Sequence, residues 1–358
     1  MTGTRAPLRG MTYDETAAAL ADLGEKPFRA AQVFDWVHAK RVTDFDSMTN
    51  LPKTLRAHLA ETHTIAVPEI LRTERSKADG TAKYLFRLSD GECIESVCMP
   101  YRFGNTVCVS SQAGCAMGCA FCASCADGLK RNLTADEMLS QVYALADAEE
   151  GNVTHVVVMG MGEPLQNTDN LIRFVTILSD ERGMHLGRRH ITVSTCGIVP
   201  QIARIAREIP QINLAVSLHA ATQEKRETIM PVARMYPLPE LMDACAAYGR
   251  QTGRQVTFEY ALIRGVNDSD EDAANLAALL PDISRTVNLI PVNPVRGNGF
   301  TGPERTDVLK FKKNLEKMGI HVTIRRELGR DINGACGQLV RRHREDFFAE
   351  DLFGNRHR

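Results

Sequence analysis

The chain has 358 residues, of which 44% are hydrophobic and 24% charged, and its formal net charge is −1. These values are typical of globular proteins and exclude a disordered chain or a strongly basic nucleic-acid coat protein, although a local basic patch can still hold a polyanion. No apolar run is long enough to cross a bilayer, and the N-terminal segment lacks the apolar stretch of a secretory signal. We therefore expect a cytoplasmic protein without a membrane partner, whose ten cysteines need a chemical explanation.

Residues 1–65 are predicted to form a small helical module. Thr12 and Glu15 give a capping-box pattern before an alanine-rich run, and a second helix is expected to begin at Pro27. Between residues 26 and 58, six Lys or Arg stand against three Asp. This local excess of positive charge is a weak signal for a partner of negative charge.

The chain from residue 101 to residue 340 alternates short β-branched strands with stretches long enough for a helix. The expected strands are NTVCVS, VTHVVVMG, HITVST, INLAVSLH, VTFEYALI, TVNLIPV and HVTIRRE. This alternation predicts the α/β class, with a parallel sheet closed as a complete or partial β/α barrel. We place a connecting β segment at residues 66–100 and a basic C-terminal tail at residues 341–358.

Four short motifs follow directly after expected strands: GMGEP, STCG, SLHA and NP. In β/α barrels the chemistry lies at the C-terminal ends of the strands. A ligand at the mouth of the barrel would therefore contact all four motifs.

Cys115, Cys119 and Cys122 stand in GCAMGCAFC, a C-x3-C-x2-C spacing just after the expected strand that contains Cys108. Three thiolates on so short a loop can hold three irons of a [4Fe–4S] cluster and leave the fourth iron open to a substrate. Structural zinc is an alternative because Cys125 adds a fourth thiol, although such sites usually take two ligand pairs from separated turns. A second alternative, that these cysteines are merely small buried residues, fits one cysteine better than three or four in one short stretch.

This cysteine spacing, with Phe121 before the last cysteine, resembles the signature of the radical S-adenosylmethionine (SAM) enzymes. The segments CVSSQAGCAMGCAFC, MGMGEPLQN, VSTCGIVP, LAVSLHA, VNLIPVNP and DINGACGQL are similar to those of the RlmN/Cfr family, and the similarity reaches back to KPFRAAQVFDWVHAK. Pro164 resembles the RlmN branch, which methylates carbon 2 of adenine. The Cfr branch, which methylates carbon 8, tends to replace that proline.

The resemblance implies a radical SAM (partial) β/α barrel with a small N-terminal helical domain. It implies methylation of carbon 2 of an adenosine in 23S rRNA and of an adenosine next to the tRNA anticodon, with two SAM consumed per methyl group. The implied cofactors are SAM and a [4Fe–4S] cluster held by Cys115, Cys119 and Cys122. The implied partners are the two RNAs, an external electron donor and a thiol reductant, and the chain is expected to be a monomer. The alternatives are carbon-8 methylation of the Cfr type and an iron–sulfur RNA-binding or redox-sensing protein without methyl transfer.

The resemblance also implies seven SAM contacts: Gly162, Glu163, Ser194, Ser217, Leu218, His219 and Asn293. A carboxylate and backbone groups can accept hydrogen bonds from the SAM ammonium or a ribose hydroxyl, and Ser, His and Asn suit ribose and adenine edges. Taken singly, a Ser or Asn after a strand is more often a turn residue. Only the presence of all seven residues within the family's motifs favours SAM binding.

By the same resemblance, Cys336 carries the methyl group as S-methylcysteine, because adenine is too weak a nucleophile for direct transfer from SAM. A 5′-deoxyadenosyl radical removes hydrogen from that methyl group, and the methylene radical adds to the ring. The Cys108 thiolate then attacks the Cys336 sulfur and leaves a transient disulfide. Glu95 matches the family's proton acceptor.

The remaining cysteines and the basic C-terminal stretch are not matched to a catalytic role. The cysteines expected to be ordinary buried thiols are Cys93, Cys98, Cys196 and Cys245. Residues 310–344 hold ten Lys or Arg against three acids, an excess that predicts contacts with RNA phosphates. The alternative for its first part is a solvated helix face.

Overall fold

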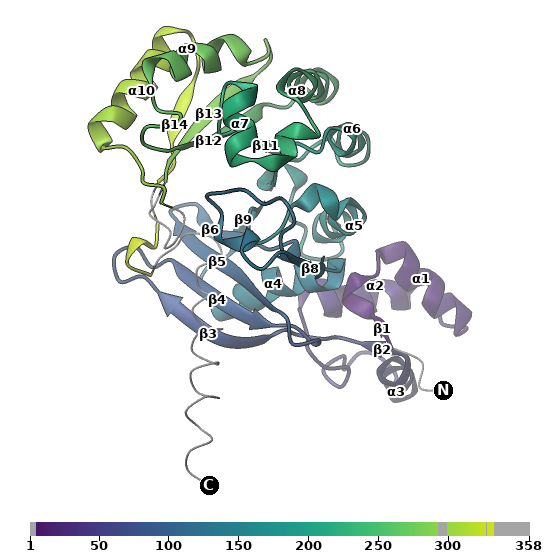
Figure 1. Ribbon diagram of the computed structural model, residues 1–358. Coiled ribbons are helices and arrows are strands. Elements are labelled where there is room, and N and C mark those ends of the chain that lie inside the picture. Colours follow the sequence, from purple (N-terminus) through teal and green to yellow (C-terminus); the bar gives the residue numbers. More distant parts are fainter. Residues whose placement is uncertain (1–4, 293–298, 327, 333–358) are drawn as a thin grey trace, which may run out of the picture.

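The structure, a computed structural model, describes residues 5–292, 299–326 and 328–332. Its main sheet has the strand order β14-β13-β12-β11-β10-β9-β6-β5-β4-β3 (Figure 1). The parallel strands are β6 (Gly104–Val109), β9 (Val153–Val158), β10 (Ile191–Thr195), β11 (Asn213–Ser217), β12 (Val256–Leu262), β13 (Arg285–Pro291) and β14 (Val322–Ile324). They coincide with the strand segments predicted from the alternating pattern, and the α/β class is confirmed. Within the described residues β14 and β3 remain at the edges, so the barrel is partial.

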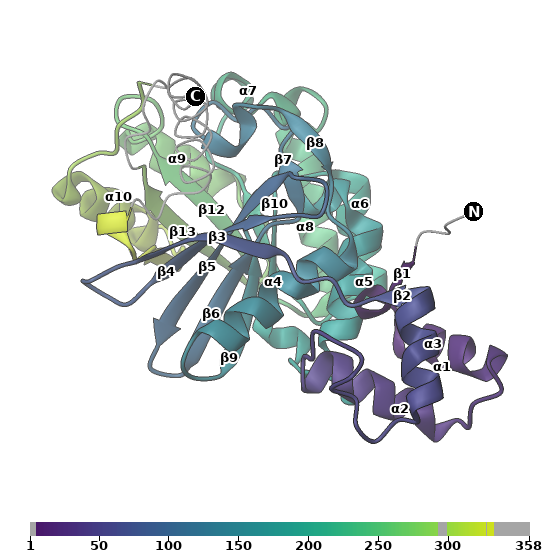
Figure 2. The same ribbon diagram turned by 90° about the horizontal axis from the view of Figure 1, so that it is seen from below.

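Helices fill the crossovers between neighbouring parallel strands. They are α4 (Ala135–Ala148), α5 (Thr168–Leu178), α6 (Val199–Glu208), α7 (Gln223–Ile229), α8 (Leu238–Thr252), α9 (Asp270–Leu279) and α10 (Arg305–Lys317). In α5, Leu171, Phe174 and Leu178 recur at helical spacing and are buried in the main core. Figure 2 shows α4, α5, α6 and α8 along the outer side of the sheet. In the described part of the chain, every helix is too short or too polar to cross a membrane.

Three antiparallel strands extend the sheet beyond β6. They are β3 (Glu69–Arg75), β4 (Ala82–Arg87) and β5 (Cys93–Tyr101). Val97 of β5 pairs with Lys83 on one side and with Cys108 on the other. Paired residues point to the same face of a sheet, and so do residues two positions apart in one strand. Lys83, Glu95 and Cys108 therefore share one face.

Short helices and a two-stranded sheet form the N-terminal part. Its elements are β1 (Ala6–Pro7), α1 (Tyr13–Asp22), α2 (Phe28–Phe34) followed by a π-helical turn (Asp35–Ala39), α3 (Lys53–Thr62) and β2 (His63–Thr64). The capping box of Thr12 and Glu15 is confirmed at the start of α1. The second helix begins at Phe28, with Pro27 as its N-cap. A separate cluster of buried apolar side chains packs these helices together.

Two buried polar contacts attach the N-terminal part to α4. Arg9 donates to the Ser140 hydroxyl at 2.8 Å, and His38 Nδ1 lies 2.8 Å from the Tyr143 hydroxyl. Arg9 and His38 are each only 1% exposed. Figure 1 shows the N-terminal helices at the end of the molecule next to α4 and α5, so this part packs on the outside of the barrel.

Candidate active site

A cavity of about 570 Å³ lies at the C-terminal ends of the parallel strands, and this volume is typical of ligand and cofactor sites. Its wall contains these predicted site residues: Glu95, Cys108, Cys115, Cys119, Cys122, Gly162, Glu163, Ser194, Ser217 and His219. The Leu218 side chain is instead buried in the hydrophobic core. Asn293 and Cys336 lie outside the described residues.

The cluster loop, which we define as residues 115–128, joins the antiparallel strands β7 (Gln112–Gly114) and β8 (Leu129–Asn132). Gly114 has a φ of +77°, and a Cβ atom there would lie 2.0 Å from the carbonyl oxygen of Gly128. Only glycine permits so close an approach. The two ends of the loop therefore meet directly.

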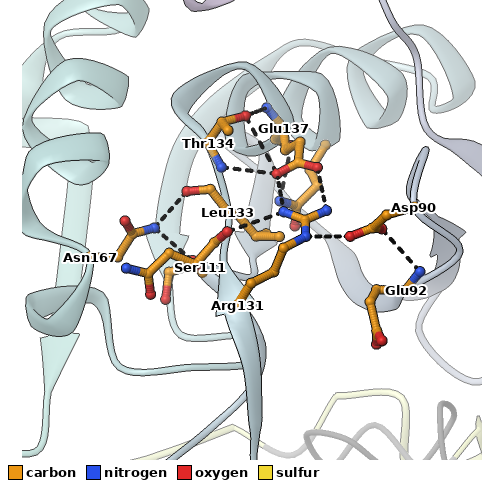
Figure 3. Close-up of polar contacts among 10 residues, drawn as sticks. Asp90, Glu92, Ser111, Arg131, Leu133, Thr134, Glu137 and Asn167 are labelled. Carbon is orange, nitrogen blue, oxygen red and sulfur yellow. Dashed lines mark hydrogen bonds and ion pairs between the residues drawn. The ribbon is translucent and has the colours of Figure 1, made fainter.

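Arg131 fixes the base of this hairpin (Figure 3). Its guanidinium donates to the two carboxylate oxygens of Glu137 at 2.7 and 2.8 Å, and it also donates to Asp90. Asn167, which follows β9, donates to two backbone carbonyls that flank the hairpin. The cluster loop is thus anchored to α4, to the β4–β5 turn and to the segment after β9.

The thiols of the cluster loop gather around Cys125. Hydrogen bonds from the thiols of Cys115, Cys119 and Cys122 lower the pKa of Cys125, and the same contacts, together with burial, raise the pKa of Cys115 and of Cys119. Cys125, which the sequence analysis considered only as a fourth ligand of the zinc alternative, thus approaches all three proposed cluster ligands. In the described residues, no group of three or more His, Cys, Asp or Glu side chains could hold a single metal ion. Three soft sulfur donors on one loop beside a cavity nevertheless suit an iron–sulfur cubane.

The segment of Gly162 and Glu163 is fixed on β7. A Cβ atom at Gly162 would lie 2.5 Å from Cβ of Gln112, and the Glu163 amide donates to the Gln112 side chain at 2.8 Å. The Glu163 carboxylate accepts from the amides of Cys196, at 2.7 Å, and Leu165, at 2.9 Å. Burial raises the pKa of Glu163, and these hydrogen bonds oppose the rise. The carboxylate therefore organises two strand ends in addition to facing the cavity.

His219 is held as a neutral imidazole. Its Nδ1 accepts the Ala261 amide at 2.9 Å, which places the ring proton on Nε2. Burial lowers the pKa of His219 to about 3. Its backbone has a φ of +58°, and Asn267 supports this unusual conformation by donating to the His219 carbonyl at 2.7 Å. The edge of the ring packs against Phe121 of the cluster loop, with ring centroids 4.8 Å apart.

Arg226 is a site residue that the sequence did not reveal. Its guanidinium is fully buried and donates to the carbonyls of Cys196 at 2.7 Å, Leu218 at 3.2 Å and Ser217 at 3.4 Å. The Ser217 hydroxyl lies 3.5 Å from that of Ser194. Arg226 therefore holds the ends of β10 and β11 side by side. A charged residue in a short polar helix such as α7 normally indicates solvent exposure, so the sequence carried no signal for this role.

Lys83 is a residue of the cavity wall that the sequence did not reveal. Its Nζ lies 3.4 Å from Oε1 of Glu95, and the two side chains are 1% and 5% exposed. The contact depends on the register between β4 and β5, which the sequence does not specify. Glu95, read alone, would be taken as an exposed strand residue.

The other cysteines differ in their burial. Cys98, Cys196 and Cys245 are buried, as expected, whereas Cys93 is only partly buried. Burial raises the pKa of Cys98 and of Cys245 to about 12, so both thiols stay protonated near neutral pH. Cys196 also lines the cavity.

The described part of the basic C-terminal stretch divides into two. On α10, Lys310 lies 2.8 Å from Asp270 and Lys312 lies 3.5 Å from Glu316, as on an ordinary solvated helix face. Arg325 and Arg326, which follow β14, line the cavity instead. Residues 333–344 lie outside the described residues.

Two family models match parts of this chain. A model of the Radical SAM superfamily matches residues 109–277, and a model of the ribosomal RNA large subunit methyltransferase N-terminal domain matches residues 6–65. The fold and the site thus define a radical SAM protein. A probable dual-specificity RNA methyltransferase RlmN of Lachnospira eligens is 50% identical over 344 residues, which cover 96% of this chain and 98% of the relative. The chain therefore belongs to the RlmN family.

Two further relatives agree with this assignment. A probable dual-specificity RNA methyltransferase RlmN of Symbiobacterium thermophilum is 50% identical, and the match covers 94% of this chain and 92% of the relative. The crystal structure of a radical SAM methyltransferase from Sphaerobacter thermophilus has a TM-score of 0.89 and 47% identity, and covers 93% and 98% of the two chains. The cofactors of this superfamily are a [4Fe–4S] cluster and SAM.

Proposed function

We propose that this chain methylates carbon 2 of adenosine in 23S rRNA and tRNA through an S-methylcysteine, with two SAM consumed per methyl group. The observation that carries the proposal is the shared cavity, which joins the cluster loop, the strand ends and the face that bears Glu95 and Cys108. Membership of the RlmN family favours this reaction over an iron–sulfur protein that only binds RNA or senses redox state. Pro164 favours carbon 2 over the Cfr-type carbon 8.

In this proposal the cluster loop and the strand ends hold the cofactors. The cluster ligands are Cys115, Cys119 and Cys122, and the SAM contacts are Gly162, Glu163, Ser194, Ser217, Leu218, His219 and Asn293. When bound, the [4Fe–4S] cluster supplies the electron that cleaves SAM and accepts the electron that the RNA adduct later loses. The neutral His219 can donate from Nε2 to an acceptor on SAM. Leu218, whose side chain is buried, can contribute only through its backbone.

The other face of the cavity supplies the thiol chemistry and the proton acceptor. Cys336 carries the methyl group, and after its methylene carbon has bonded to the ring, Glu95 takes the ring proton. The Cys108 thiolate then attacks the Cys336 sulfur, so that a sulfur–sulfur bond forms and the carbon–sulfur bond breaks. The electron pair of the broken bond remains on the methylene carbon, which takes a proton and becomes the methyl group. An external thiol reductant restores the two cysteines.

RNA is proposed to bind at the cavity mouth and on the N-terminal part. Arg325 and Arg326 in the cavity wall and the excess of Lys and Arg between residues 26 and 58 support this placement. Cytoplasmic location, a monomeric state and the external electron donor complete the proposal. Removal of residues 1–65 should reduce RNA methylation more than SAM cleavage, and affinity for RNA should fall steeply with salt. Equal loss of both activities would show that this part supports the fold and does not dock RNA.

The decisive experiment uses the two cysteines separately. With Cys108→Ala, the methylene carbon should bond to the RNA but no thiolate remains to release it, so the enzyme should carry RNA through denaturing electrophoresis. Cys336→Ala should give neither this adduct nor methylated RNA. Cys93→Ala, on the same strand as Glu95, is the control and should turn over normally.

The RNA product decides among the alternatives. Mass spectrometry of RNA methylated by the wild-type enzyme should find the new methyl group on carbon 2 of adenine, and a methyl group on carbon 8 would establish the Cfr-type alternative. Normal turnover by Cys108→Ala, or methylation by Cys336→Ala, would overturn the two-cysteine mechanism.

A further inference from the structure

The pairing of β4, β5 and β6 brings a lysine to the proposed proton acceptor. Lys83 and Cys108 are both paired with Val97, and Glu95 stands two positions before Val97 on the same strand. All four side chains line the cavity. The ammonium of Lys83 is 3.4 Å from the carboxylate of Glu95, and both groups are almost inaccessible to water from the surface, with 1% and 5% of the side chains exposed.

A carboxylate at this depth needs a cation if it is to stay ionised. Burial disfavours the charged form of a carboxyl group, and an opposite charge within roughly 4–6 Å restores it. The ionisable groups that share the cavity with Glu95 are Lys83 from β4, Cys108 from β6, the cluster-loop cysteines, Glu163, Cys196, His219 and Glu259 from the other strand ends, and Arg325 and Arg326 from the segment after β14. Among these, Lys83 is the cation whose salt bridge with Glu95 is directly observed.

We propose that Lys83 is a positioning residue that keeps Glu95 ionised, and therefore able to accept a proton, when the RNA adduct forms. This inference rests on the proposed function, in which Glu95 is the proton acceptor. In that step the bond between the ring carbon and its hydrogen breaks, the electron pair stays in the ring, and the proton moves to a carboxylate oxygen of Glu95. Lys83 acts through Glu95 and contacts neither the RNA base nor SAM in this role.

The charge of Lys83 also influences the step that follows. Once Glu95 is protonated, the adjacent ammonium favours loss of that proton, because a positive neighbour stabilises the carboxylate. The methylene carbon needs a proton when the carbon–sulfur bond breaks, and its electron pair becomes the new carbon–hydrogen bond. Lys83 thereby prepares Glu95 both to take the ring proton and to give it up again.

The pH profile of RNA release tests this role. In Lys83→Met the acid limb of the single-turnover pH profile should move to higher pH, because the cation that stabilises the Glu95 carboxylate is lost. At neutral pH the release rate should fall about tenfold for each pH unit by which that limb moves, and it should recover at higher pH. The covalent adduct should accumulate on denaturing gels at neutral pH, while 5′-deoxyadenosine formation stays at the wild-type level. Lys83→Arg should keep the wild-type profile.

The matched control is Lys77→Met, in the exposed turn between β3 and β4, which should leave both the rate and the profile unchanged. A loss of rate in Lys83→Met that is equal at every pH would indicate a merely structural lysine and overturn the inference. An unshifted profile would also overturn it. If Glu95→Gln releases RNA normally, the assignment of Glu95 in the proposed function fails, and that result is distinct from either outcome at Lys83.

An infrared measurement on the wild-type chain tests the inference even if Lys83→Met does not fold. The difference spectrum between wild type and Glu95→Gln at neutral pH should contain carboxylate bands. A carbonyl band of a protonated carboxylic acid in that spectrum would show that Glu95 is neutral and that Lys83 does not hold it ionised.

Discussion

The cavity has two walls that use polar side chains differently. The strand-end wall consists of Glu163, Ser194, Ser217 and His219, with Arg226 and Asn267 behind them. Its charged and amide groups donate to or accept from backbone groups of neighbouring strands. The β4–β6 wall consists of Lys83, Glu95 and Cys108. There, two charged side chains pair with each other across adjacent strands.

In the proposed function, this difference separates cofactor binding from proton transfer. Hydrogen bonds to the backbone fix the orientation of a side chain, and the low pKa of His219, about 3, keeps that wall's imidazole neutral near physiological pH. Such a wall can hold a cofactor in one pose. The ion pair of the other wall joins two side chains, Lys83 and Glu95, across adjacent strands. In the proposed function, the strand-end wall holds SAM and the β4–β6 wall serves the chemistry on RNA.

The largest effect is expected at the cluster loop, on which both walls depend. Replacing Cys115, Cys119 or Cys122 by Ala should abolish iron binding and 5′-deoxyadenosine formation, because in the proposed function each of these thiolates would hold one iron of the cubane. Cys125→Ala is the control and should retain both. Iron and sulfide analysis with a SAM cleavage assay measures the outcome. Loss of iron in Cys125→Ala, with retention in one of the other three, would show that the ligand set is different.

The second largest effect is expected on the free energy of unfolding, and it tests whether the strand-end wall also supports the fold. Arg226→Met removes hydrogen bonds to three carbonyls, two of them buried, so the free energy of unfolding should fall by about 3 kcal/mol or more. Arg207→Met, on the exposed face of α6, should change it by less than about 0.5 kcal/mol. Urea denaturation measures both. A loss below about 1 kcal/mol for Arg226→Met would mean that the strand ends hold together without it.

Local signals explain what the sequence predicted about the fold. The capping box at Thr12 involves residues three positions apart, and each parallel strand is a β-branched run followed by a helical stretch. The spacing of Cys115, Cys119 and Cys122 lies within one loop. Such patterns are complete within a short segment, so they can be recognised before any tertiary contact is known.

The missed residues act through tertiary contacts. Lys83 meets Glu95 only because β4 and β5 pair in one particular register, and Arg226 meets the ends of β10 and β11 only because α7 folds back over them. Asn267 has the same character, since its partners lie on β12 and after β11. Each of these side chains is polar and would be expected at the surface from its type alone. Their burial depends on the register of the strands and on the placement of the helix. A single sequence specifies neither of these.

A smaller effect is expected behind His219. Asn267 donates to the carbonyls of His219 and Ala261 and accepts the Ile263 amide, at 2.6–2.7 Å. Asn267→Ala should lower the free energy of unfolding by about 2 kcal/mol. It should also raise the Kd for SAM by about tenfold, the equivalent of one lost hydrogen bond. Calorimetry of SAM binding measures the second effect, and Asn314→Ala is the control, because Asn314 is half-buried on α10 and donates to Asp270 away from the cavity.

Wild-type affinity in Asn267→Ala would show that His219 keeps its pose without this support. An equal loss of SAM affinity in Asn314→Ala would show that the loss in Asn267→Ala reflects general destabilisation. Either result would remove the distinction between the two walls as far as SAM is concerned.

The smallest effect is the pH dependence that the neutral His219 imposes on stability. Because burial holds its pKa at about 3, the unfolded chain binds a proton below pH ~6.5 that the folded chain does not. The free energy of unfolding should therefore fall as the pH falls from 6.5 toward 3, by about 1.4 kcal/mol per unit for this group. Buried His38, whose pKa burial also lowers to about 3, should contribute a similar slope.

His219→Asn isolates the part that belongs to the strand-end wall. Asparagine tolerates the left-handed backbone and can accept the Ala261 amide, so the variant should fold and should lose about 1.4 kcal/mol per pH unit of the wild-type slope between pH 6.5 and 5. His185→Asn is the matched control, because His185 is exposed and also has a left-handed φ, +55°. Urea denaturation at several pH values measures the slopes. If His219→Asn leaves the slope unchanged, the His219 imidazole takes up its proton in the folded protein as it does in the unfolded chain. The strand-end wall would then change charge with pH and would not differ from the other wall in this respect.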